Sequence, residues 1–410
     1  MILVESHTFN QKHDYFKELD NLCFLSKNLY NSTLFAMKQH FFDTGKTLTY
    51  FDVSKLFTHS KQQDYTALPA KVSRGTQRLV WKNMLSFFAL IKKKDNNARP
   101  PKYLDSVKGR QVVHYEKGAL SFVKKEGYIH LSKTNIYIKT SKGKDVVQFV
   151  RIIPRGNHIN VEVGYNVTES EPKIDNQRYA SIDLGINNLM TITSNIHSPY
   201  IINGKPLKSI NQYYNKKLAQ YRSELKKRNN KHNSKKIMRL TKKRNFKVKD
   251  YIHKSTTYVV NQLVSNQINT LVIGYNKGWK QDITLGKQTN QKFVNIPYLQ
   301  IINTLKYKCQ LKGIKVVIRE ESYTSKCSFI DNEDVKKQIE YKGKRVYRGL
   351  FKTNNGLLIN SDVNGSLNIL KKHLLSMDKN VVQKFSIENI LKDCIDVVCS
   401  TQKIHKVSMK

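Results

Sequence analysis

The chain has 410 residues, 39% of them hydrophobic, so it is long enough to bury more than one core. It carries 72 Lys and Arg residues against 31 Asp and Glu residues, a formal net charge of +41. Such a surplus repels itself unless a polyanion neutralises it. An anionic membrane surface is disfavoured, because the basic residues are spread along the whole chain instead of flanking an apolar helix face. Nucleic acid is therefore the expected partner, since it binds cationic proteins with release of condensed counterions.

Five cysteines at irregular spacing predict no disulfide framework. The first residues lack the pattern of a signal peptide, and no apolar run approaches the length that spans a membrane. We expect an intracellular, soluble protein with no membrane partner, in the cytoplasm or nucleoid if the host is prokaryotic.

The N-terminal part combines predicted helices with short predicted strands. Residues 2–6 are expected to form a strand, and apolar residues spaced by three or four predict helices from about Leu19 onward and over 75–94. Alternating β-branched and aromatic residues over 111–167 predict antiparallel strands of a small barrel or sheet. We therefore expect a β-unit formed by residues 1–18 and 96–170, with a helical unit, residues 19–95, inserted in it.

After a polar linker, residues 179–194 read as a strand, a tight turn at Gly185 and a second strand. Residues 270–276 predict a buried strand of the parallel type, and 314–320 the next strand. Between them, Pro297 is expected in the first turn of a helix that Gly313 closes. The expected inner face of that helix is Leu299, Ile302, Leu305 and Cys309. This order of strands and helices is an α/β arrangement.

The segment 216–250 is extremely basic, and its only acids are Glu224 and Asp250. Its apolar residues have a helical period that is broken at Asn229 and Asn230. A solvated helix face is the usual explanation of a charge run, but such faces normally mix both signs. We favour a segment that follows a phosphate backbone. The candidate nucleic-acid-binding residues are Lys226, Lys227, Arg228, Lys235, Lys236, Arg239, Lys242, Lys243 and Arg244.

Four acids lie in contexts that suit metal-assisted cleavage of a phosphodiester, which needs carboxylates converging on two divalent ions about 3.5–4 Å apart. Asp183 ends an apolar strand, although an Asp there could simply cap a turn. Asp362 precedes an amphipathic helix, where a helix N-cap is the alternative role. Glu320 and Glu321 end the strand 314–320, where they could merely terminate it at the surface.

The segments around these acids resemble TnpB-type transposon proteins, which are similar to the type V CRISPR effector nucleases. SIDLGINN, residues 181–188, resembles the first RuvC motif of that family, and SDVNGSLNIL, residues 361–370, resembles the third. The resemblance extends over most of 150–374. It implies an α/β RNase H-like (RuvC) nuclease domain split in sequence, plus an N-terminal β-barrel wedge with an inserted helical recognition unit. The nuclease domain would be 172–375, with a basic helical insert at 206–255, a ribbon-like insert at 326–361 and a tail at 376–410.

The resemblance also implies an RNA-guided DNA endonuclease associated with a transposon. Its partners would be a guide RNA from the transposon end and a double-stranded DNA target beside a short recognised motif. Asp183 and Asp362 would be catalytic acids that bind two Mg²⁺ ions, for which Mn²⁺ can substitute.

The sequence departs from the family at the second RuvC motif, where most members carry an acid and this chain has Gly274. The next acid along the chain is Asp282. Either cleavage is lost, or a carboxylate from the adjacent strand reaches the same point. Because neighbouring strand residues face opposite sides, only one of the two glutamates should do so, and we expect Glu321, with Glu320 as the alternative. The competing hypotheses are a nuclease-deficient RNA-guided DNA-binding repressor or transposition accessory protein, and a nuclease or RNA-binding protein without a guide.

A second departure concerns zinc. Family members often hold a tetrahedral zinc with paired CxxC motifs between the second and third RuvC motifs. In this chain the insert 326–361 contains a single cysteine, Cys327, so no structural zinc is expected. A hydrogen-bonded hairpin around 341–351 would have to stabilise the insert instead.

Overall fold

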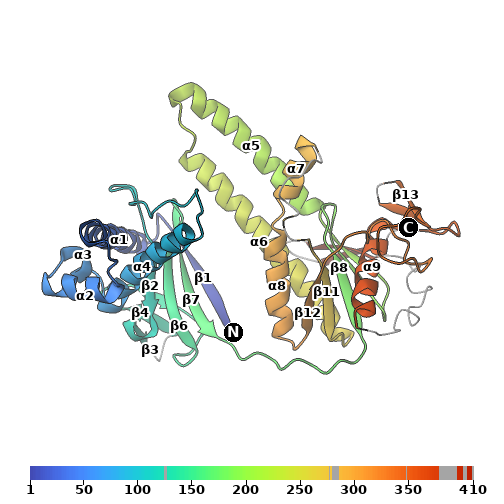
Figure 1. Cartoon of the computed structure of the whole chain (residues 1–410), viewed down its shortest axis with the longest axis horizontal. Helices are drawn as coiled ribbons and strands as arrows, with labels where there is room; N and C mark the ends of the chain where they lie inside the picture. The colour runs from blue at the N-terminus through green and yellow to red at the C-terminus, as the bar shows by residue number, and fades with distance from the viewer. Residues whose placement is uncertain are drawn as a thin grey trace. The chain divides into compact units, whose positions relative to one another are not determined.

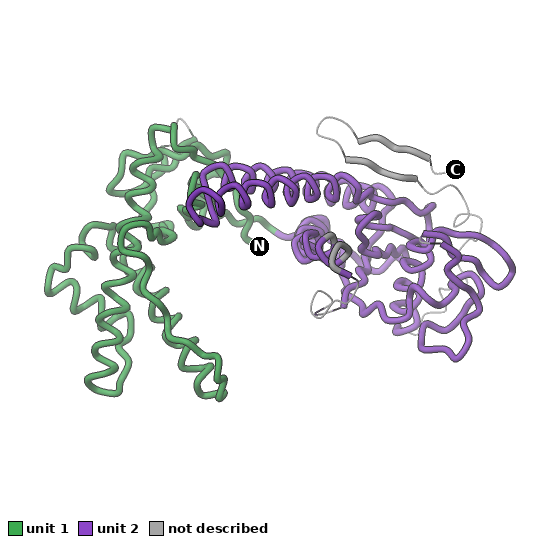
Figure 2. The backbone as a smooth tube through the Cα atoms, turned by 90° about the horizontal axis from the view of Figure 1, so that it is seen from above, with its two compact units in different colours: residues 1–168 green, residues 169–410 purple. Residues whose placement is uncertain are grey.

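A computed structural model of the chain describes residues 1–123, 127–276, 278, 286–347 and 349–377, together with the backbone of 395–399 and 404–408. The chain divides into two compact units, residues 1–168 and residues 169–410 (Figures 1 and 2). Asp282, the acid that follows Gly274 in the sequence, lies outside the described residues.

The first unit places helices against antiparallel strands (Figure 1). Its described strands form a four-stranded sheet of order β1-β7-β6-β2 and a three-stranded sheet of order β3-β4-β5. The expected antiparallel strands are therefore confirmed. The elements are β1 (Ile2–Asn10), α1 (Phe16–Thr44), α2 (Tyr50–His59), α3 (Gln63–Thr66), α4 (Ala70–Lys92), β2 (Val113–Glu116), a 3₁₀ turn (Lys117–Ala119), β3 (Leu120–Val123), β4 (Tyr128–Leu131), β5 (Tyr137–Lys139), β6 (Val147–Pro154) and β7 (His158–Asn166).

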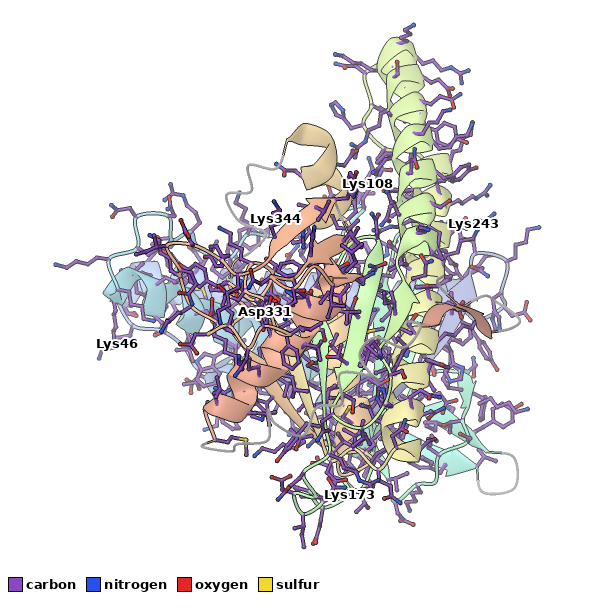
Figure 3. The ribbon with its side chains drawn as sticks, turned by 90° about the vertical axis from the view of Figure 1, so that its right-hand side faces the viewer. Lys46, Lys108, Lys173, Lys243, Asp331 and Lys344 are labelled. Atoms are coloured by element: carbon purple, nitrogen blue, oxygen red, sulfur yellow. The ribbon has the colours of Figure 1, made fainter. Side chains whose placement is uncertain are left out.

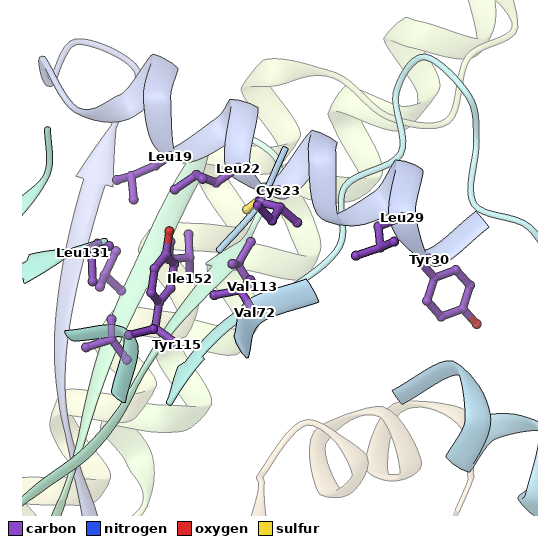
Figure 4. Close-up of a cluster of buried hydrophobic side chains, with 14 of the residues drawn as sticks. Leu19, Leu22, Cys23, Leu29, Tyr30, Val72, Val113, Tyr115, Leu131 and Ile152 are labelled. Carbon is purple, nitrogen blue, oxygen red and sulfur yellow. The ribbon is translucent and has the colours of Figure 1, made fainter. Parts of the chain in front are cut away.

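One hydrophobic core stabilises this unit (Figure 4). Leu19 and Leu22 of α1 lie over Tyr115 and Ile152 of the sheet, and all four side chains are buried. The two helices expected from the apolar spacing are α1 and α4, and both begin a few residues earlier than predicted. Burying apolar side chains of this size contributes about 1.5–3 kcal/mol each, so the helices are stabilised mainly by packing.

The second unit is built on a mixed sheet whose described strands have the order β12-β11-β8-β9-β10-β16-β17. Strand β8 runs parallel to β11, and β11 runs parallel to β12, whereas β8, β9 and β10 form an antiparallel meander. The elements are β8 (Tyr179–Asp183), β9 (Asn188–Ser194), β10 (Tyr200–Asn203), α5 (Lys205–Asn229), α6 (Lys235–Ser265), β11 (Thr270–Gly274), α7 (Lys287–Val294), α8 (Tyr298–Gln310), β12 (Lys315–Arg319), β13 (Lys344–Tyr347), β14 (Leu350–Lys352), β15 (Leu358–Asn360), α9 (Ser361–Leu375), β16 (Ile395–Cys399) and β17 (Ile404–Ser408).

Strand β11 is buried on both faces, as its continuous apolar sequence predicts. Leu271 and Ile273 pack into the core that α6 and α8 share, while Val272 faces α9 on the other side. The sheet is therefore covered on both faces, and its edge at the carboxyl ends of β8, β11 and β12 stays available for a site.

Helix α8 begins directly after Pro297, as expected. Its predicted inner face is partly wrong, because Leu299 is 59% exposed. The buried residues are Tyr298, Ile301, Ile302, Thr304, Leu305 and Cys309. These follow the spacing of three and four residues that defines one helix face, and position 299 lies off that face.

Candidate active site

The topology of the sheet brings three chain segments to one edge. Asp183 is the last residue of β8 and Gly274 is the last residue of β11. In the parallel ladders Ile182 pairs with Ile273, and Gly274 pairs with Arg319. The residues that follow Arg319 therefore emerge beside Gly274, where the carboxyl ends of the parallel strands meet.

The carboxylate of Glu321 lies in the space above Gly274. A Cβ atom added to Gly274 would be 2.8 Å from Oε2 of Glu321 and 2.5 Å from Cδ1 of Ile369. The backbone N–H of Glu321 donates to Oδ1 of Asn276 at 3.0 Å, which links the segment after β12 to the segment after β11. Glu321 thus places an acid where a side chain at position 274 would begin.

Glu320 points elsewhere. Its side chain is 55% exposed and accepts a hydrogen bond from Nζ of Lys372 at 2.7 Å. The two adjacent glutamates therefore differ in environment, as the alternation of side chains in extended chain requires.

Asp362 belongs to the first turn of α9 but does not cap it. The N-cap is Asn360, whose Oδ1 accepts from the backbone N–H groups of Asp362 at 2.8 Å and Val363 at 3.3 Å. The N-cap role considered for Asp362 is therefore wrong, and its carboxylate instead accepts from Nδ2 of Asn188 at 2.7 Å. Asn188 follows the turn after β8, so this bond ties α9 to the segment that carries Asp183.

Two features hold α9 against the strand that ends in Asp183. Gly365 allows close approach, because a Cβ atom there would lie 2.8 Å from Oδ2 of Asp183. Behind it, Ser181, Thr193 and Ser366 form a buried triangle of hydroxyl groups with O···O distances of 2.8 to 3.1 Å. Sequence reasoning missed this triangle, because nothing in the chain order indicates that Ser366 of α9 meets Ser181 and Thr193.

The acids at this edge influence one another electrostatically. Desolvation by burial raises the pKa of Asp183 well above its usual range, and the nearby Glu321 and Asp362 raise it further, against the opposing charge of Arg345. Desolvation, with the charge of Glu320, raises the pKa of Glu321 to about 7. Such shifts are typical of carboxyls that are deprived of water and placed near like charges.

The carboxylates do not form a closed metal cage. Within the described part of the chain, no three Asp, Glu, His or Cys side chains are grouped so that they could hold a metal ion as they stand. Glu321 and Asp362 are close enough to Asp183 to raise its pKa. Tightening around a divalent ion would relieve that repulsion.

The basic segment forms a helical hairpin of α5 and α6. Asn230 takes a left-handed conformation directly after α5, with φ of 52°, which confirms the predicted break at Asn229 and Asn230. Of the nine candidate basic residues, the exposed ones are Lys226, Lys227, Arg228, Lys235, Lys236, Arg239 and Lys243. The side chain of Lys243 projects from the hairpin (Figure 3).

Arg244 and Lys242 differ from those seven, because each is only partly exposed. Arg244 donates from Nε to Oδ1 of Asn211 at 2.8 Å and from a terminal nitrogen to the carbonyl of Asn295 at 2.9 Å. Through these bonds the guanidinium connects α6 to α5 and to the end of α7. Sequence alone could not distinguish this arginine from its exposed neighbours.

The insert at 326–361 is organised around a buried carboxylate. Glu333 is 4% exposed, and it accepts from the backbone N–H groups of Ser328 at 2.7 Å and Lys342 at 3.1 Å. Lys371 of α9 donates to the carbonyl of Glu333 at 3.0 Å. Asp331, which is labelled in Figure 3, accepts from the backbone N–H of Asn354 at 2.9 Å. The predicted hairpin is present as β13 and β14. The carboxylates of Glu333 and Asp331 accept hydrogen bonds from the backbone just before and just after it.

Comparisons with known proteins match two separate parts of this chain to family models. Residues 158–280 match the family model OrfB_IS605, described as a probable transposase, and residues 298–369 match the Cas12f1-like TNB domain. The TnpB-like protein ORF457 of Acidianus two-tailed virus is 24% identical over 400 residues, covering 87% of this chain and 83% of that protein.

Two solved structures are also similar. The Cas12f1–sgRNA–target DNA complex matches 87% of this chain and 82% of its own protein chain, with 16% identity and a TM-score of 0.51. The mini-RNA-guided endonuclease CRISPR-Cas_phi3 matches 90% of this chain and 92% of its own, with 10% identity and a TM-score of 0.48. The first of these shows that the chain shares the fold of a Cas12 effector. None of the helices in the described residues has the length and apolarity needed to cross a bilayer.

Proposed function

We propose that this chain, a TnpB-type protein by its sequence matches, is an RNA-guided DNA endonuclease whose RuvC-like site uses Asp183, Glu321 and Asp362. The observation that carries the proposal is the position of the Glu321 carboxylate over Gly274. The acid that the second RuvC motif lacks is then supplied by the adjacent strand, so the glycine does not by itself abolish the site.

The three acids would hold two Mg²⁺ or Mn²⁺ ions, because carboxylate oxygens are the ligands that hard divalent cations prefer. When bound, these ions supply an activated water and stabilise the leaving oxygen of the phosphodiester. Asp183 and Glu321 must release the protons that burial favours before they can act as ligands. Asn188 donates to one oxygen of Asp362 and would help to orient this carboxylate as a ligand.

The partners required by this function are a guide RNA from the transposon end and a double-stranded DNA target. The exposed cations of the α5–α6 hairpin give the protein a surface for a phosphate backbone. The similar Cas12f1 structure is a complex with a guide RNA and target DNA. Sequencing the RNA that copurifies with the protein would identify the guide, and absence of any bound RNA would favour a nuclease that works without one.

The decisive experiment compares the two adjacent glutamates. Glu321→Ala should abolish nicking of a cognate plasmid in Mg²⁺, whereas Glu320→Ala, which removes an exposed partner of Lys372, should leave most of it. Asp183→Ala and Asp362→Ala should behave as Glu321→Ala does. All variants should bind guide and target normally, because the basic surface and not the acids supplies affinity.

Restoring an acid at position 274 tests the geometry further. In the Glu321→Ala background, a Cβ atom at position 274 loses its 2.8 Å contact with Glu321, and its remaining close contact is with Ile369. Partial recovery of nicking in the double variant would support convergence of the two strands on one metal position. Full activity of both glutamate variants would place the third ligand elsewhere and refute the assignment.

A second candidate function is RNA-guided DNA binding without cleavage. It is favoured by Gly274, which leaves the second RuvC motif without an acid of its own. A wild-type protein that binds a cognate target but leaves it intact in both Mg²⁺ and Mn²⁺ would establish this reading.

A further inference from the structure

A hollow of about 400 Å³ lies between α5, α7 and the turn that follows β8. Its volume falls in the range of sites that bind small molecules or single nucleotide units. The wall is rich in carboxamides from α5 and from the segment that ends α7: Asn211, Gln212, Asn215, Gln291 and Asn295. Helix α7 lies beside α5 in Figure 1.

Some of these carboxamides are used within the protein and others are not. Asn211 accepts a hydrogen bond from Arg244 and donates one to the carbonyl of Asn295, so its side chain stabilises the wall of the hollow. Three others have no side-chain hydrogen bond to the described part of the chain: Gln212, Asn215 and Gln291. Each of them offers two N–H donors and one carbonyl acceptor to whatever enters.

The remaining lining supplies an apolar surface and positive charge. Ile186 and Ile296 contribute the apolar part, and Lys208 and Lys216 contribute ammonium groups. Lys208 donates to Oδ1 of Asn187 at 3.1 Å, which leaves two of its three N–H groups for a ligand. A flat, partly apolar ligand with donors and acceptors along its edge and an anion at one side matches this lining, and a nucleotide has these properties.

The hollow is adjacent to the candidate active site. Ile186 follows Asp183 by three residues, so their Cα atoms are at most about 11 Å apart. On the other side, Tyr298 follows Ile296 by two residues and donates its hydroxyl to the carbonyl of Gly185 at 3.2 Å. Both walls thus continue into the turn that carries the first catalytic acid.

We infer that the hollow holds an unpaired nucleobase of the DNA strand next to the phosphodiester that is cut. Gln212, Asn215 and Gln291 would contact the base edge, and Lys208 and Lys216 the adjoining phosphate. Cations alone would be sufficient to bind a phosphate backbone. Carboxamides instead form hydrogen bonds with the edge of a base, and a base can reach them in the hollow only when it is turned out of its duplex. The inference rests on the proposed nuclease function for the identity of the strand.

The test separates base recognition from phosphate binding. A fluorescein-labelled oligonucleotide of ten thymidines and an abasic oligonucleotide of equal length carry the same phosphates, so their affinity ratio cancels counterion release. The ratio is measured on the guide-bound full chain without divalent metal. The variant Asn215→Ala/Gln291→Ala should reduce it about tenfold, because two base-contacting side chains are lost and no charge changes.

The matched control is Gln220→Ala/Asn261→Ala, which removes two exposed carboxamides of α5 and α6 outside the hollow and should keep the wild-type ratio. A ratio equal in both double variants would overturn the inference. An equal loss of affinity for both oligonucleotides would also overturn it, since it would indicate a phosphate site. The binding readout is independent of cleavage, so a wild type that nicks no DNA would refute the nuclease while a reduced ratio still supported the hollow.

Discussion

Glu321→Gln should stabilise the metal-free protein at alkaline pH. The folded protein raises the pKa of this carboxyl to about 7 from an ordinary value of 4.5. Between these two values the folded state holds a proton that the unfolded state has released, so the free energy of unfolding of the wild type falls as pH rises through that window. A shift of 2.5 pKa units (7 − 4.5) corresponds to at most about 3.4 kcal/mol, and about 2–3 kcal/mol is expected because part of the side chain remains solvated.

Glutamine has the same shape and cannot ionise, so the free energy of unfolding of the variant does not fall through this pH window. Thermal unfolding in EDTA at pH 5 and pH 8 should give a difference between variant and wild type that grows by about 5 °C with pH. Adding Mg²⁺ at pH 8 should raise the midpoint of the wild type and raise that of Glu321→Gln much less, because the ion no longer finds this ligand. Glu320→Gln is the matched control, since it replaces an exposed carboxylate whose ion pair with Lys372 lies at the surface, where such pairs contribute little to stability. If the two glutamine variants show the same pH dependence, Glu321 is not the desolvated member of the pair, and the assignment of the third ligand loses its physical basis.

Other predictions concern the basic hairpin, the insert and the helix that carries Asp362. Replacing Lys226, Lys227 and Arg228 with Ala should weaken binding uniformly across sequences and reduce the slope of log affinity against log salt by up to about 2.7, and an unchanged slope would identify a plain solvated helix. Elemental analysis should find no stoichiometric zinc, and one zinc per chain would show that the chain assembles a zinc site although the insert has a single cysteine. Glu333→Ala should cost about 2–3 kcal/mol of stability and speed proteolysis of the insert, because two backbone N–H groups lose their acceptor, while an unaffected rate would show that the carboxylate is dispensable. Gly365→Ala should impair nicking but not target binding, because the added Cβ lies 2.8 Å from Oδ2 of Asp183, a proposed catalytic acid, and normal nicking would show that α9 can shift without harm.

The sequence by itself predicted a polyanionic partner and contained the principal motifs. A net charge of +41 constrains the partner whatever the fold, because repulsion does not depend on tertiary detail. Their contexts made Asp183 and Asp362 candidates, and the resemblance of the surrounding segments to RuvC motifs, not the contexts alone, implied a catalytic role. The break at Asn229 and Asn230 was also local, since asparagine tolerates the left-handed backbone that ends α5.

The tertiary structure decided the roles that depend on contacts between distant segments. The sequence favoured Glu321 and left Glu320 open, and the folded chain separates them, because Glu321 lies over Gly274 whereas Glu320 is exposed and pairs with Lys372. The sequence did not show that Asn360 is the N-cap of α9, because Asp362, two residues away, is an equally good capping residue by type. Arg244 resembled its exposed neighbours until packing directed it toward Asn211 and Asn295. Local sequence fixes helices, strands and charge through short-range interactions, whereas which polar group meets which is set only when the folded backbone brings remote residues within hydrogen-bonding distance.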